Sequence, residues 1–123
     1  YFIEEVNQTK QLIYDNREKK YLFDIQICIG NIDSYIGEPK LFERLEEPDA
    51  LDAVERNLEI IGEAINQLLK INSSIPISNA RRIVDARNKI IHGYDSLESV
   101  NIWAIVVNHL PTLKEEITDL LNG

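Results

Sequence analysis

Residues 49–70 read DALDAVERNLEIIGEAINQLLK, and this stretch decides the fold. Its apolar residues recur at alternating steps of three and four: Leu51, Val54, Leu58, Ile61, Ile65 and Leu68. An α-helix has about 3.6 residues per turn, so this spacing puts them all on one face. Pro48 and Asp49 suit the first turn of a helix. The stretch therefore predicts a long amphipathic helix that buries one side.

Helical spacing continues through most of the chain, while strand patterns are nearly missing. Residues 18–36 and 97–121 carry similar stripes, the second crossing Pro111 as one kinked helix or two helices nearly in line. Residues 72–76 predict a loop, after which Ser78 or Asn79 caps a further helix. The sequence thus predicts one domain over 1–123, an all-α antiparallel bundle of four to five helices, with residues 1–16 as a short helix or N-terminal extension.

Charge and composition limit the binding partners and the cellular location that we expect. The net charge of −8 argues against bulk affinity for nucleic acid, yet residues 77–94 carry four basic residues against one acidic residue. This local basic face fits a polyanion, an acidic partner or a solvated helix surface equally well. A single cysteine, no visible signal-peptide pattern and no apolar run near the roughly 18 residues of a membrane span predict a cytoplasmic protein without membrane contact.

Residues 87–94, RNKIIHGY, carry the candidate chemistry. Arg87 lies in the middle of an apolar stripe formed by Ile83, Val84, Ile90 and Ile91, where an unpaired charge is costly to bury. His92 follows five residues later, about 140° around a helix, so the two side chains do not converge easily. Unwinding at Gly93, the length of the arginine, or a second copy of the helix across a two-fold axis would each bring them together. The third arrangement is favoured, because it also covers the stripe.

Two interpretations of these residues stay open. In one, the imidazole of His92 transfers protons and the guanidinium of Arg87 stabilises a phosphorane during RNA cleavage. In the other, Arg87 simply pairs with a carboxylate such as Glu63, and His92 caps a helix end. Arg56, Glu59 and Glu63 are also spaced for ion pairs along one helix. No cluster has metal-ligand spacing, so no metal and no cofactor are expected.

Several segments together resemble the HepT-like branch of the HEPN superfamily. They are RNLEIIGEA at residues 56–64, RNKIIHGY at 87–94, WAIV at 103–106 and LPTL at 110–113. The resemblance runs from about residue 18 to the end, in the order and spacing of the family. It departs from the family where Asp95 replaces the usual aromatic residue after Tyr94.

The resemblance implies a homodimeric bundle joined through the motif helices, and a metal-independent endoribonuclease that is the toxin of a type VII-like toxin–antitoxin pair. Arg87 and His92 match the catalytic residues of the family, and Asn88 matches the polar residue beside the arginine. Lys89 and Glu63 are expected to support the site and position RNA. The implied partner is a minimal nucleotidyltransferase antitoxin that transfers AMP from ATP to Tyr94.

The alternative belongs to another class. The chain can instead be a catalytically silent helical module that binds a nucleotidyltransferase subunit. The acidic net charge and Asp95, an acid beside the expected RNA groove, favour this hypothesis.

Overall fold

The computed structural model describes residues 16–38, 40–92 and 99–123, with the backbone alone for residues 90–92 and 99. These residues contain six helices and no strand: α2 (Asn16–Ile36), α3 (Phe42–Leu45), α4 (Pro48–Ile71), α5 (Ala80–His92), α6 (Ser99–Asn108) and α7 (Leu110–Asn122). The predicted all-α fold is confirmed. The predicted N-terminal extension lies outside the described residues, except for Asn16, which begins α2.

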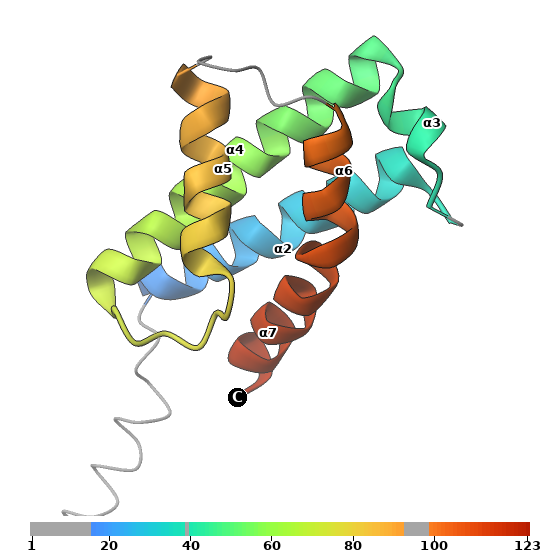
Figure 1. Ribbon diagram of the computed structural model, residues 1–123. Helices are drawn as coiled ribbons and strands as arrows, with labels where there is room; N and C mark the ends of the chain where they lie inside the picture. The colour runs from blue at the N-terminus through green and yellow to red at the C-terminus, as the bar shows by residue number, and fades with distance from the viewer. Residues whose placement is uncertain (1–15, 39, 93–98) are drawn as a thin grey trace, which may run out of the picture.

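The helices form a bundle around α2 and α4, which run antiparallel (Figure 1). The start of α4 is Pro48, as the sequence predicts, because a proline at the first helical position gives up only an N–H that would lack a partner anyway. The helix ends after Ile71, where the backbone N–H of Asn72 still bonds the Leu68 carbonyl. α4 therefore begins and ends within one residue of the positions predicted from the sequence.

The loop after α4 is closed by its own polar groups and by α7. The side-chain oxygen of Asn72 accepts a hydrogen bond from the backbone N–H of Ser74 at 3.0 Å. The backbone N–H of Ser78 donates to a carboxylate oxygen of Glu116 on α7 at 2.9 Å. α5 then begins at Ala80, directly after the predicted cap position. These two hydrogen bonds hold the loop that leads into α5.

The segment across Pro111 forms two successive helices. α6 ends at Asn108, and His109 precedes α7, whose first turn contains Pro111. The backbone N–H of His109 donates to the Ile105 carbonyl at 2.9 Å, so the chain breaks its helix only briefly. α7 packs on α2, and α6 packs on α7 and α3. Of the two arrangements that the sequence left open, the second is confirmed.

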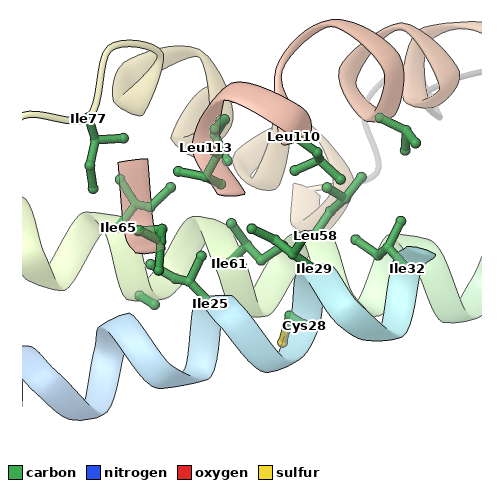
Figure 2. Packing of buried hydrophobic residues seen from close by; sticks show 14 of the residues in the cluster. Ile25, Cys28, Ile29, Ile32, Leu58, Ile61, Ile65, Ile77, Leu110 and Leu113 are labelled. Atoms are coloured by element: carbon green, nitrogen blue, oxygen red, sulfur yellow. The ribbon is translucent and has the colours of Figure 1, made fainter. Parts of the chain in front are cut away.

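The core is built from the apolar stripes that the sequence predicts. Figure 2 shows side chains from α2, α4 and α7 interleaved in one layer. The fully buried residues include Leu22, Ile25, Ile29, Ile32, Ile36, Leu58, Ile61, Ile65, Leu68, Ile83 and Ile102. Trp103 is partly buried and meets the ring of Phe42 edge-to-face at 5.6 Å between centroids. Burial of these stripes supplies most of the driving force that closes the bundle.

One polar link crosses the α2–α4 contact. The Asn31 amide donates to the side-chain oxygen of Asn57 at 3.1 Å, and the Asn57 amide donates to the Ala53 carbonyl at 2.8 Å. Asn57 is buried, so these bonds satisfy groups that would otherwise be costly to remove from water. The link fixes the register in which α2 lies beside α4.

Candidate functional site

Arg87 enters the site through a close approach of α5 to α4. A Cβ atom added to Gly62 would overlap the Cβ of Arg87 and stand 2.8 Å from its Cγ. The same atom would lie 3.3 Å from the Ile83 carbonyl oxygen. Only glycine leaves room for α5 at this point of α4. The backbone of α4 therefore forms the wall against which the stem of Arg87 packs.

This packing revises the reason given for a dimer. Ile83 and Val84, the stripe residues before Arg87, are only 2% and 6% exposed, because α4 covers them within one chain. An uncovered apolar stripe around Arg87, which the sequence suggested a second copy would bury, does not exist at these positions. The side chains of Ile90 and Ile91, the rest of the predicted stripe, lie outside the described residues. Dimerisation itself stays a prediction.

The guanidinium of Arg87 is held by Glu63. Its Nη2 lies 2.8 Å from Glu63 Oε2, while Gln67 Nε2 donates to Glu63 Oε1 at 2.8 Å. The Arg87 side chain is 14% exposed and the Glu63 side chain is 51% exposed. Water screens a carboxylate this exposed, so the ion pair orients the guanidinium more than it stabilises the fold. The predicted Arg87–Glu63 pairing is present in the structure.

The ion pair with Glu63 leaves part of the hydrogen-bonding capacity of the guanidinium unsatisfied. The Nε of Arg87 is buried and has no hydrogen-bond partner among the residues that the structure describes. An arginine carries five N–H donors, and Glu63 is the ion-pair partner seen for this one. The Arg87 side chain is thus mostly buried between α4 and α5, positioned by one carboxylate and with its Nε donor unpaired.

The other predicted residues are placed unequally. Asn88 is half-buried and Lys89 is exposed on the same turn of α5. The structure brings neither into a hydrogen bond with Arg87 or Glu63. α5 stays helical through His92, so the offset of about 140° from Arg87 persists in the backbone. The side chain of His92, and all of Tyr94, lie outside the described residues.

Ion pairing along α4 differs from the prediction. Arg56 and Glu59 take part in none of the ion pairs that the described residues form, and Glu63 pairs across to α5. Gly62 lets α5 approach α4, which puts the guanidinium of Arg87 within reach of Glu63. The roles of Gly62 and Gln67 were not predicted from the sequence. A glycine inside an otherwise strong helix is the signal that could have revealed the close approach.

Residues 16–38, 40–92 and 99–123 show neither a metal-ligand cluster nor a membrane-spanning helix. Those ranges hold no group of three or more His, Cys, Asp or Glu side chains arranged to bind a metal ion. None of the helices described has the length and apolar character that crossing a membrane requires.

Known proteins match this chain over most of its length. The family model described as ribonuclease HepT-like matches residues 25–120. "Putative RNase MJ0127" of Methanocaldococcus jannaschii is 31% identical over 107 residues, covering 84% of this chain and 86% of the relative. "Probable ribonuclease HepT" of Thermococcus cleftensis is 32% identical over 106 residues, covering 83% and 94%.

No solved structure matches the chain with significant similarity. The family match covers the segments on which the sequence resemblance was based, and the two relatives each cover more than four fifths of the chain. They confirm that resemblance. The chain belongs to the HepT-like ribonuclease family.

Proposed function

We propose that this protein is a metal-independent endoribonuclease and the toxin subunit of a type VII-like HEPN/nucleotidyltransferase toxin–antitoxin pair. One observation carries the proposal beyond family membership. Arg87 is packed against α4 at Gly62, its side chain is 14% exposed, and it is oriented by Glu63. An arginine fixed in this way is preorganised to stabilise a phosphate that gains charge in the transition state.

The proposed chemistry divides between two side chains. His92 accepts the proton of the ribose 2′-hydroxyl, or protonates the leaving 5′-oxygen, as the new bond from O2′ to phosphorus forms. Arg87 stabilises the phosphorane, and the products carry a 2′,3′-cyclic phosphate and a 5′-hydroxyl. Asn88 and Lys89 position the RNA strand along α5, and Glu63 positions Arg87. Imidazole and guanidinium supply both the proton transfer and the charge stabilisation, so the reaction needs no metal ion.

The offset between Arg87 and His92 motivates the proposed homodimer. Because α5 remains helical through His92, the two residues point to different sides of one helix. Two motif helices related by a two-fold axis would place the Arg87 of one subunit near the His92 of the other. Ile83 and Val84 already face α4, so the dimer would use the C-terminal part of α5 and not its buried stripe.

Control of the toxin is assigned to Tyr94. A minimal nucleotidyltransferase antitoxin would transfer AMP from ATP to its hydroxyl, releasing pyrophosphate. The attached group adds bulk and negative charge two residues after His92, where an RNA phosphate would otherwise lie. In this proposal both proteins act in the cytoplasm, and the modified toxin no longer binds RNA.

Expression in a bacterial host tests the whole proposal. The chain alone should arrest growth, His92→Ala should be harmless, and the gene adjacent to this one in its genome should relieve the arrest. Intact-mass measurement of the co-expressed protein should show shifts in steps of one AMP, which Tyr94→Phe abolishes. Growth arrest that persists in His92→Ala would contradict the catalytic assignment.

A second candidate function is the catalytically silent binding module for a nucleotidyltransferase subunit. The observation in its favour is the Arg87–Glu63 pair, which already neutralises the arginine, on a chain of net charge −8. This alternative predicts a harmless chain that co-purifies with its partner and carries no AMP.

A further inference from the structure

A pocket lies directly beside the carboxylate that holds Arg87. It has a volume of about 390 Å³ and opens between α2 and α4. α2 contributes Lys20, Tyr21 and Asp24, and α4 contributes Glu59, Ile60, Glu63 and Ala64. Glu63 is thus shared, since it lines the pocket and contacts the Arg87 guanidinium at 2.8 Å. A group in this pocket would be a close neighbour of a phosphate held by Arg87.

The carboxylates of the pocket are not equivalent. Asp24 pairs with Lys20 at 2.9 Å, and Glu63 is engaged by Arg87 and Gln67. Glu59 makes none of the hydrogen bonds or ion pairs found within the described residues. Among the pocket carboxylates, Glu59 therefore keeps both oxygens free to accept hydrogen bonds, while Asp24 uses Oδ2 for Lys20 and keeps only Oδ1 free.

The charge around the pocket determines which chemical groups can enter it. Burial first, then the carboxylates of Asp52 and Glu59, raise the pKa of Glu55 one turn earlier on α4. The acidic residues around the pocket repel a phosphate and favour a group that donates hydrogen bonds. A phosphate belongs at Arg87, outside the pocket, while a neutral donor group belongs against Glu59.

The remaining walls suit a flat apolar group. Ile60 is 43% exposed, which is unusual for an isoleucine beside a helix–helix contact. Tyr21 presents an aromatic ring, with Lys20 Nζ 5.6 Å from its centroid. Aromatic rings and apolar side chains are the usual platform for an unstacked RNA base. The volume lies within the range of small-molecule sites, about 300–1,000 Å³.

We propose that this pocket is a base-recognition subsite of the ribonuclease, which holds the base next to the scissile phosphate and selects bases with an exocyclic amino group through Glu59. The inference rests on the proposed function and adds a substrate preference to it. Cytosine, adenine and guanine each offer an amino donor to a carboxylate. Uracil faces a carboxylate with carbonyl oxygens on either side of its single N–H, so it is disfavoured.

Nucleoside binding tests the subsite without any cleavage step. Cytidine and uridine are titrated into ¹⁵N-labelled full-length protein, and the amide signals of Lys20, Tyr21, Ile60 and Ala64 are followed. Cytidine should shift these signals with about tenfold higher affinity than uridine, as expected for one good charge-assisted base contact. Glu59→Gln should remove that preference, because an amide also donates to uracil. Glu115→Gln, an equivalent change at an exposed position of α7 outside this pocket, should leave the preference intact.

Nucleoside binding tests the subsite separately from the nuclease activity. A nucleoside has no phosphate, so its binding does not depend on Arg87 or His92. Equal shifts by both nucleosides, or no shift of these amides by cytidine, overturn the subsite. Cleavage-site sequencing on random RNA gives the matching result: uracil is depleted about tenfold at one position flanking the cut, and Glu59→Gln restores it. Cytidine binding in a protein that cleaves no RNA would support the subsite and contradict the nuclease.

Discussion

The Cβ atom of Arg87 occupies the space in which any side chain at Gly62 would stand. This contact joins the candidate site to the fold, because it sets how closely α5 approaches α4. It also brings Arg87 within 2.8 Å of Glu63, the residue after the glycine. The position of the guanidinium is thus set by Gly62, which has no side chain, and by the carboxylate of Glu63.

Replacing Gly62 by alanine should push α5 away from α4. Overpacking of this kind costs about 1–3 kcal/mol, which outweighs the gain in helix propensity. Thermal unfolding should show a lower Tm, and RNA cleavage should fall with it. Gly30→Ala is the matched control: a Cβ there meets nothing within 4 Å, so it should stabilise α2 by about 0.5–1 kcal/mol. Similar Tm changes for both variants would contradict the close approach.

Glu63 should act on the rate more than on RNA binding. Glu63→Ala frees the guanidinium to move, and small misplacements of a catalytic group are costly, so kcat should fall by roughly tenfold with little change in KM. Glu63→Gln keeps an oxygen that can accept from Arg87 and should recover part of the lost rate. Steady-state cleavage of a labelled oligonucleotide measures both. Equal loss in the two variants would show that Glu63 contributes by its charge and not by orienting Arg87.

The amide link between Asn31 and Asn57 should contribute measurably to stability. Asn57→Ala removes a buried group that bonds both Asn31 and the Ala53 carbonyl, at an expected cost of about 1–2 kcal/mol in urea unfolding. Ser34→Ala, on the exposed side of α2, should change the free energy of unfolding by less than about 0.5 kcal/mol. A double-mutant cycle between the two asparagines that gives no coupling would argue against the link.

Cys28 should resist alkylation in the folded protein. Burial, reinforced by the carboxylate of Asp24, raises the pKa of its thiol, and the side chain is 5% exposed. Only the thiolate reacts, so labelling near pH 8 should be slow until urea unfolds the chain. The protonated thiol favours the folded state below the unfolded pKa of about 8.5, and this contribution is lost as the pH rises through the raised folded value. Labelling as fast as in the unfolded chain would refute this.

Apolar periodicity was enough to predict the helices that bury a continuous stripe. The stripe from Val54 to Leu68 and that from Leu22 to Ile36 both lie in the core, because helical spacing alone puts such residues on one face. α3 was not predicted, since four residues are too few to show a helical period. Periodicity says which face is buried but not what covers it.

That limit applies to the stripe around Arg87, of which the structure describes only the side chains of Ile83 and Val84. The sequence placed Arg87 correctly within an apolar stripe, and a dimer seam was one way to cover that stripe. The structure covers Ile83 and Val84 with α4 instead, which depends on Gly62, a residue whose effect is visible only when two helices are brought together. The pairing of Arg87 with Glu63 was foreseen among the alternatives because both charges needed partners.

The proposed ribonuclease activity is tested by incubating RNA with the purified protein in EDTA. We expect products ending in 2′,3′-cyclic phosphate and 5′-hydroxyl, formed by the wild type and lost in both Arg87→Ala and His92→Ala. Circular dichroism of each variant serves as the folding control. An intact RNA after incubation with the wild type, or cleavage that continues unchanged in folded His92→Ala, would contradict the account.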